Sequence, residues 1–238
     1  MSEYGNLETL SAFWDRTNSF IWDSLPHGGD FVTNPNLGMK VDASGALKPY
    51  FGNTVVFTLP KDVQKKIEII RDRLYRDSAE LLAEPLSTDS FHITLHDLLS
   101  GNPANELTQR VESIRASAIE YVEQIKARNE TVRLHSTALF NMVGSSLVLG
   151  FAPADEESCR KLMEYYAVLQ NVVHLNYPLT PHVTVAYYRP GVFRAEQTDK
   201  LQAVINEVRE AERIEAELPV AALEYQLFSD MNHYWEAV

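Results

Sequence analysis

The chain contains one four-residue pattern twice, as His92-Ile93-Thr94-Leu95 and as His182-Val183-Thr184-Val185. Each copy lies in a short run rich in β-branched residues, which favours a strand. Residues two apart in a strand point to the same face, so each copy presents an imidazole beside a hydroxyl and turns its apolar residues toward a core. The chain must therefore display two equivalent His/Thr pairs on two strands.

The elements predicted around the two patterns follow the same order in both halves of the chain. His92 follows Val55 by 37 residues (92 − 55), and His182 follows Leu147 by 35 residues (182 − 147). Hydrophobic periodicity predicts strands at 54–59, 91–96, 132–140, 146–151, 183–188, 220–228 and 234–237, and helices at 61–82, 103–128, 155–169 and 195–211. Duplicated halves usually pack about a pseudo-two-fold axis, so we expect the two His/Thr pairs to meet in one cleft.

Residues 1–50 differ in character from the rest. An amphipathic helix is predicted over 7–25, and a stretch rich in Gly, Pro and Asn follows it. A short hairpin is predicted between 39–41 and 46–47. We expect this segment to wrap on the main fold and not to form a separate domain.

Composition limits the partners. Lys and Arg total 21 against 33 Asp and Glu, giving a net charge of −12. Proteins that grip long nucleic acids usually carry a basic face, and none is visible here, so we expect no extended nucleic-acid surface. The sequence has no apolar run near membrane-spanning length. We also expect no secretory leader, because residues 1–10 include Glu3 and Glu8 and show no basic, apolar stretch. Cys159 is the only cysteine, which excludes an internal disulfide and is consistent with a cytoplasmic location.

The paired patterns resemble the 2H phosphoesterase superfamily, which includes bacterial RNA-ligase-like proteins and RNA 2′,3′-cyclic phosphodiesterases. A poorly characterised subgroup of it has phrases similar to Phe51-Gly52-Asn53-Thr54-Val55-Val56 and Phe228-Ser229-Asp230-Met231-Asn232. The resemblance implies an α+β, bilobal, pseudo-two-fold duplicated fold over 51–238, with two mostly antiparallel sheets flanked by helices around a central cleft. The lobes would cover about 51–142 and 143–238 and could exchange strands.

The residue types fit metal-independent hydrolysis of a cyclic or 2′-linked nucleotide phosphodiester. His92 and His182 would act as general acid and base, in an order that the sequence does not decide, because a histidine pKa near 6.5 makes both protonation states accessible. Thr94 and Thr184 would bind the phosphate oxygens. We expect a small nucleotide or an RNA end as substrate, no cofactor, no metal, no membrane contact and a monomer.

Three further residues are candidates for substrate contact. Strand alternation places His96 on the face of His92 and Tyr188 on the face of His182, with Tyr187 toward the core. Arg189 directly follows and could reach an anion. The alternative to an enzyme is a non-catalytic nucleotide-binding or sensing protein on the same fold, in which the motifs bind without turnover.

Overall fold

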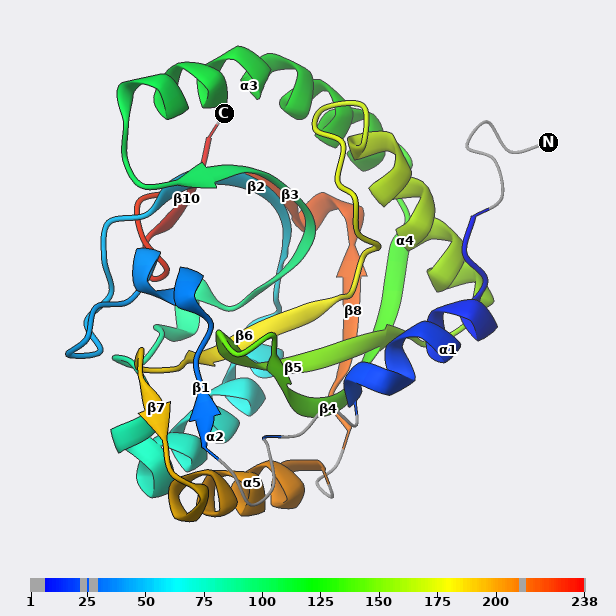
Figure 1. The fold of residues 1–238 in the computed structure, drawn as a ribbon. Coiled ribbons are helices and arrows are strands. Elements are labelled where there is room, and N and C mark those ends of the chain that lie inside the picture. The colour runs from blue at the N-terminus through cyan, green and yellow to red at the C-terminus, as the bar shows by residue number, and fades with distance from the viewer. Residues whose placement is uncertain (1–6, 22–24, 26–29, 210–212, 238) are drawn as a thin grey trace.

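The computed structural model describes residues 7–21, 25, 30–209 and 213–237 (Figure 1). Its helices are α1 (Leu10–Ile21), α2 (Lys61–Ser78), α3 (Asn105–Lys126), α4 (Glu156–Leu169) and α5 (Ala195–Arg209). Its strands are β1 (Phe31–Val32), β2 (Phe51–Thr58), β3 (His92–Gly101), β4 (Thr131–Met142), β5 (Ser146–Pro153), β6 (His182–Tyr187), β7 (Val192–Phe193), β8 (Glu215–Pro219), β9 (Leu223–Phe228) and β10 (Tyr234–Glu236).

Two four-stranded sheets carry the fold. One has the strand order β10-β9-β2-β3 and the other β6-β5-β4-β8, and every pair in both is antiparallel. The short strands β1 and β7 form a third, two-stranded sheet. The predicted α+β class with mostly antiparallel sheets is therefore confirmed.

The sheet of β2 and β3 contains two strands from the second half of the chain, β9 and β10, and the sheet of β5 and β6 contains one strand from the first half, β4. β4 follows the first motif in sequence but pairs with β5, while β9 comes late in the chain and pairs with β2. The orders β3-β2-β9 and β6-β5-β4 are thus equivalent, and the two halves interlock through this exchange. It leaves β3 and β6 each at an edge of its sheet, where they contact one another in the middle of the molecule (Figure 1).

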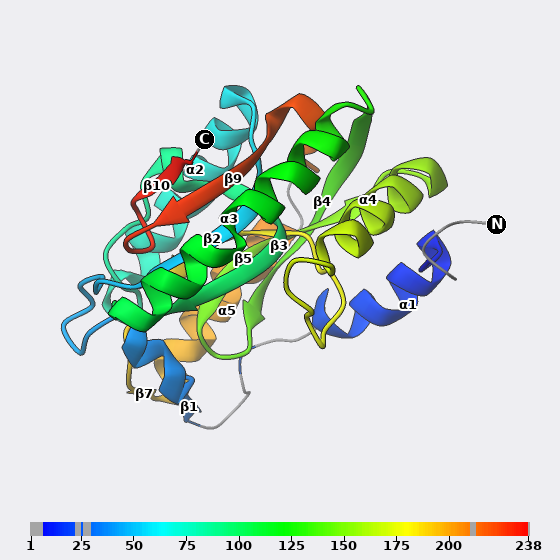
Figure 2. The same cartoon turned by 90° about the horizontal axis from the view of Figure 1, so that it is seen from above.

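The helices cover the sheets from outside. α3 lies along β9, β2 and β3, whereas α4 and α5 both contact β4, and α2 packs beside α5. Figure 2 shows α3 crossing over its sheet and α4 beside α1 at the opposite side. Helical spacing explains these contacts, because α3 buries one stripe made of Val111, Ala118, Val122 and Ile125.

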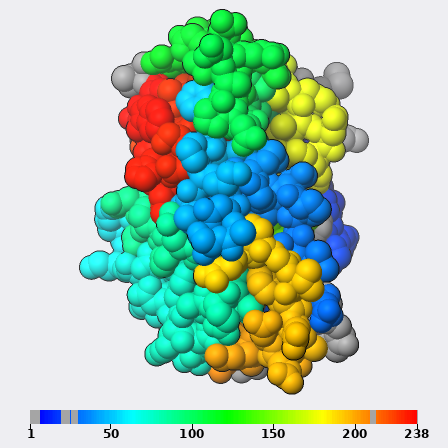
Figure 3. All heavy atoms as spheres, turned by 60° about the vertical axis from the view of Figure 1, so that its left-hand side comes forward, coloured from blue at the N-terminus to red at the C-terminus, as the bar shows by residue number. Residues whose placement is uncertain are grey.

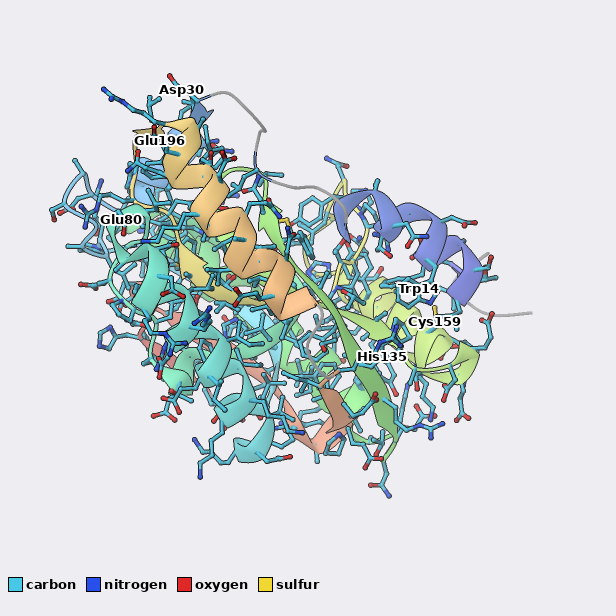
Figure 4. All side chains as sticks on the ribbon, turned by 90° about the horizontal axis from the view of Figure 1, so that it is seen from below. Trp14, Asp30, Glu80, His135, Cys159 and Glu196 are labelled. Carbon is cyan, nitrogen blue, oxygen red and sulfur yellow. The ribbon has the colours of Figure 1, made fainter. Side chains whose placement is uncertain are left out.

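The N-terminal segment lies against both parts of the fold. α1 starts later than predicted, at Leu10, and the predicted end of the helix near residue 25 adjoins residues 22–24, which lie outside the described part of the chain. Trp14 of α1 stacks on His135 of β4, with ring centroids 5.9 Å apart, near Cys159 of α4 (Figure 4). Residues 30–50 lie across another face, between α3 and the region around β7 (Figure 3).

Hydrogen bonds fix this second stretch to the hairpin between β4 and β5. The Asn34 backbone N–H donates to the Gly144 carbonyl at 2.9 Å, and its side-chain amide donates to the Val143 carbonyl at 3.1 Å. The predicted hairpin at 39–41 and 46–47 is reduced to a single bridge between Val41 and Leu47, because Pro35–Met39 forms a 3-10 helix. This helix leaves Lys40 at its end.

We predict that Gly52→Ala destabilises the protein by about 1–3 kcal/mol in chemical denaturation, because adding a side chain to a packed position forces the backbone to shift. A Cβ at Gly52 would lie 2.3 Å from the Leu99 carbonyl oxygen and 2.5 Å from the Phe228 ring. Gly38→Ala is the matched control, since a Cβ there would meet nothing within 4 Å. Equal unfolding midpoints for the two variants would contradict this account of the β2–β3 contact.

Candidate active site

The two sequence motifs line one cavity. β3 places His92 and Thr94, and β6 places His182 and Thr184, around a cavity of about 280 Å³. All four side chains are partly accessible, whereas Ile93 and Val183 between them are buried in the core. The two imidazoles and two hydroxyls thus surround a space large enough for a phosphoryl group and part of its substituents.

Backbone carbonyls orient both imidazoles. The Nδ1 atom of His182 lies 2.7 Å from the carbonyl oxygen of Thr180, and the His92 ring is hydrogen-bonded to the backbone of Ser90. Each partner lies two residues before its histidine. Because a carbonyl only accepts, the ring nitrogen that faces it must carry a hydrogen, which leaves Nε2 of His182 able to take or give a proton.

Burial favours the neutral form of both imidazoles. The pKa of His92 is lowered to about 4, chiefly by burial and also by the nearby His182, whereas the Ser90 bond and Asp97 oppose the shift. Burial likewise lowers the pKa of His182 against the opposing effects of the Thr180 bond and Asp97. A bound anion would favour the protonated forms, so ligand binding and proton uptake should be coupled.

A β-bulge follows each motif. The pairing of β2 with β3 shifts register after Thr94, and the pairing of β5 with β6 shifts after Thr184. The extra residue is Leu95 in β3 and Val185 in β6. Two equivalent bulges therefore reverse the alternation of faces at the same point of each motif strand.

These bulges turn His96 and Tyr188 away from the cavity that holds the motif histidines. His96 is 1% exposed and packs on the Tyr166 ring, where it lines the adjoining cavity described below, so its contact with substrate stays a prediction. Tyr188 is 0% exposed and packs against Phe31 and Phe193 in the core, so its predicted contact with substrate is wrong. Strand alternation without a bulge would have turned both toward the cleft.

The positions that do reach the cavity are Asp97 and Tyr187, each five residues after a motif histidine. Tyr187, which alternation assigns to the core, therefore lies on the cleft side instead. Arg189 lines neither this cavity nor its neighbour: its backbone N–H donates to the Leu81 carbonyl at 2.8 Å. The predicted contact of Arg189 with an anion has no support in this geometry.

The N-terminal segment supplies further lining residues that the motif analysis missed. The Lys40 Nζ lies 5.0 Å from the centre of the Tyr50 ring and 5.5 Å from that of Tyr187. Burial alone would lower the pKa of Lys40, but the two tyrosines and Asp97 together raise it, so the ammonium group stays charged. Nothing local in the sequence marks Lys40, because only the wrapping of residues 30–50 brings it to the site.

A second, more apolar cavity of about 480 Å³ adjoins the first and shares Thr94, Asp97 and His182 with it. Its other lining residues include His96 and Thr180 but are mainly apolar or aromatic: Leu95, Met142, Val143, Tyr166, Leu175, Tyr177, Pro178 and Leu179. Val143 stands at the β4–β5 turn with a φ of 45° and 67% exposure. A β-branched residue rarely adopts this conformation, so the turn holds an apolar side chain at the mouth of both cavities at the expense of local strain.

No group of three or more His, Cys, Asp or Glu side chains in the described part of the chain is arranged to hold a metal ion. Among the helices that the structure describes, none combines the length and apolar character needed to cross a membrane.

We predict that His92 makes the protein less stable in acid. The histidine pKa is about 6.5 in an unfolded chain, against about 4 for His92 in the folded state, so between these values the unfolded state binds more protons. The stabilisation by neutral His92 is complete above about pH 6.5 and is lost as the pH falls through 4, and it amounts to about 3 kcal/mol. The loss of unfolding free energy between pH 7 and 4.5 should be smaller for His92→Gln than for wild type.

The control is His174→Gln, at an exposed position outside both cavities. Denaturant titrations should give this variant the same acid sensitivity as wild type. If His92→Gln also loses as much stability as wild type, His92 does not carry the burial assigned to it.

Comparison with known proteins supports the fold. Neither the family models nor the curated proteins give a match. The structure is similar to that of a conserved protein of unknown function, ATU0111 from Agrobacterium tumefaciens, with a TM-score of 0.65 and 21% identity over 87% of this chain and 92% of that one. This likeness shows a shared fold.

Weaker similarities extend to two other solved structures. E. coli LigT in its apo form matches with a TM-score of 0.42 and 14% identity, over 80% of this chain and 96% of that one. TT0787 of Thermus thermophilus matches with a TM-score of 0.43 and 14% identity, over 78% and 94%. Similarities this weak carry no conclusion about activity. The comparisons therefore establish that this chain has the fold of ATU0111.

Proposed function

We propose that the protein is a 2H-type phosphodiesterase that hydrolyses a cyclic or 2′-linked nucleotide phosphodiester, with His92 and His182 as general acid and base. The observation that carries the proposal is that two His/Thr pairs, ninety residues apart (182 − 92), line one cavity. The similarity of the motifs to those of the 2H phosphoesterases supports the same reaction class.

The proton transfers balance between the two imidazoles. The neutral histidine takes a proton from water as the water oxygen bonds to phosphorus, and the protonated one gives its proton to the ribose oxygen as that bond to phosphorus breaks. The products are a phosphomonoester and a free ribose hydroxyl. Exchange with solvent then restores the original protonation states.

The two threonines suit a second role. Each lies two residues after its histidine on the same face of the strand, where its hydroxyl can donate to a non-bridging phosphate oxygen. Donors placed where negative charge grows stabilise the transition state more than the ground state. The adjoining apolar cavity is suited to the nucleoside part of the substrate, because its aromatic walls can stack on a base.

The candidate substrates are nucleoside 2′,3′-cyclic phosphates, RNA ends bearing them, 2′,5′-linked oligonucleotides and cyclic oligonucleotides. The net charge of −12 favours the smaller ones, since a long polyanion would be repelled. A substrate panel assayed in EDTA identifies the class and tests whether turnover needs a metal.

Replacement of either histidine should abolish most of the activity. We predict that His92→Ala and His182→Ala each lower kcat by about 10²–10⁴-fold on the best substrate. The control His135→Gln changes a histidine of β4 that stacks on Trp14 and lines neither cavity. Unchanged activity in the double alanine variant would end the proposal, and tight nucleotide binding by wild type without product would favour the sensing alternative.

The threonines give an independent prediction. Thr94→Val or Thr184→Val keeps the shape of the side chain but removes the hydroxyl, so kcat should fall by up to about 10²–10³-fold. Thr58→Val is the matched control, because Thr58 lies in β2 outside both cavities. Steady-state kinetics that show a change in KM alone would mean that the hydroxyls bind the ground state and not the developing charge.

A further inference from the structure

Two opposite charges flank the proposed phosphate position. Among the described residues that line the cavity of the motif histidines, Lys40 and Asp97 are the only Lys, Arg, Asp or Glu. Lys40 comes from the N-terminal segment, and Asp97 reaches the cavity because of the bulge after Thr94. Apart from the histidines, these side chains give the cavity a net charge of zero.

Both charges are held by tyrosines. Lys40 lies over the rings of Tyr50 and Tyr187. The Tyr177 hydroxyl donates to the Asp97 carboxylate at 2.9 Å, which fixes that carboxylate between the two cavities. Asp97 is close enough for its charge to favour protonation of both imidazoles and of Lys40.

A carboxylate at an anion site needs an explanation, because it weakens the attraction for every phosphate. The cost depends on ligand charge, since a Coulomb energy is proportional to it. A phosphodiester carries one negative charge, whereas a phosphomonoester carries about −1.5 to −2 at pH 7. With one imidazole protonated, Lys40 and Asp97 leave the cavity at +1, which matches the diester and not the monoester.

We propose that Lys40 and Asp97 act as a charge pair that makes the cavity selective for singly charged phosphodiesters over doubly charged phosphomonoesters. Lys40 attracts the phosphate, and Asp97 limits that attraction so that the product leaves. This inference rests on the proposed function for its biological meaning, but the charge selectivity itself can be measured without turnover.

The test is phosphorus NMR titration at pH 8 with inorganic phosphate, mainly a dianion, and with dimethyl phosphate, a monoanion. Asp97→Asn should bind inorganic phosphate about tenfold more tightly than wild type, the size expected for one charge a few ångströms away in a half-open cleft. Because the energy follows the ligand charge, the gain for dimethyl phosphate should be only about threefold. Lys40→Met should weaken both, again more for the dianion.

Matched controls distinguish a charge inside the cavity from a change in the overall charge of the protein. Asp89→Asn removes an exposed carboxylate that pairs with Lys61, and Lys48→Met removes a lysine of the same N-terminal segment. Neither residue lines the cavity, so phosphate affinity should stay at the wild-type value. The double variant Lys40→Met/Asp97→Asn should return close to wild type, because it restores the neutral pair.

Unchanged phosphate affinity in Asp97→Asn, or an equal gain for both ligands, would overturn the proposal. Asp97→Ser is a second neutral variant with a smaller side chain, and it should show the same charge dependence as Asp97→Asn. A negative result in the phosphate titration would not change the expected loss of kcat in His92→Ala and His182→Ala. If the histidine variants lose activity but Asp97→Asn shows no charge selectivity, the charge-pair proposal fails and the proposed phosphodiesterase function stands. If the histidine variants keep their activity, the proposed function itself fails.

Discussion

The contact between the edge strands β3 and β6 is the constraint on which the site depends. Each strand pairs with a neighbour on one side only, so its other edge is free to meet the equivalent strand of the other sheet. The exchange of β4 and β9 between the halves holds the two sheets together and prevents the lobes from separating without loss of strand pairing. The distance between the two imidazoles is thereby set by the core and not by loops.

The sequence pattern correctly predicted the motif strands, most of the element order, and the residues His92, Thr94, His182 and Thr184 as neighbours of one cavity. It did not predict β1, β7 or β8, and residues 220–222 of the predicted strand 220–228 form a 3-10 helix. The alternation of side chains between the two faces of a strand predicts the correct face as far as Thr94 and Thr184. It gives the wrong face beyond the next residue, because Leu95 and Val185 form β-bulges. A bulge depends on how the partner strand is paired, and no turn or glycine in the sequence marks either position. One cause therefore accounts for the faces on which His96, Tyr187 and Tyr188 lie.

Lys40 could not be identified from the sequence for a different reason. Its neighbours in sequence form a loop-rich segment, and its position over Tyr50 and Tyr187 comes from contacts made far along the chain. Among these, Asn34 bonds the turn at Gly144, and β1 pairs with β7. Such tertiary placement leaves no periodic or motif signal, so only the folded arrangement could identify residues 30–50 as part of the site.

The pKa values of the two motif histidines depend on whether an anion lies between them. Burial lowers the pKa of both imidazoles and so favours their neutral forms, whereas the proposed reaction needs one of them protonated. A phosphate bound between them supplies the negative charge that reverses this preference, because an opposite charge nearby raises a histidine pKa. The site would then acquire its acid only when a substrate is present, and proton uptake would accompany binding. Asp97 makes this uptake easier, while limiting how strongly a second negative charge on the ligand is attracted.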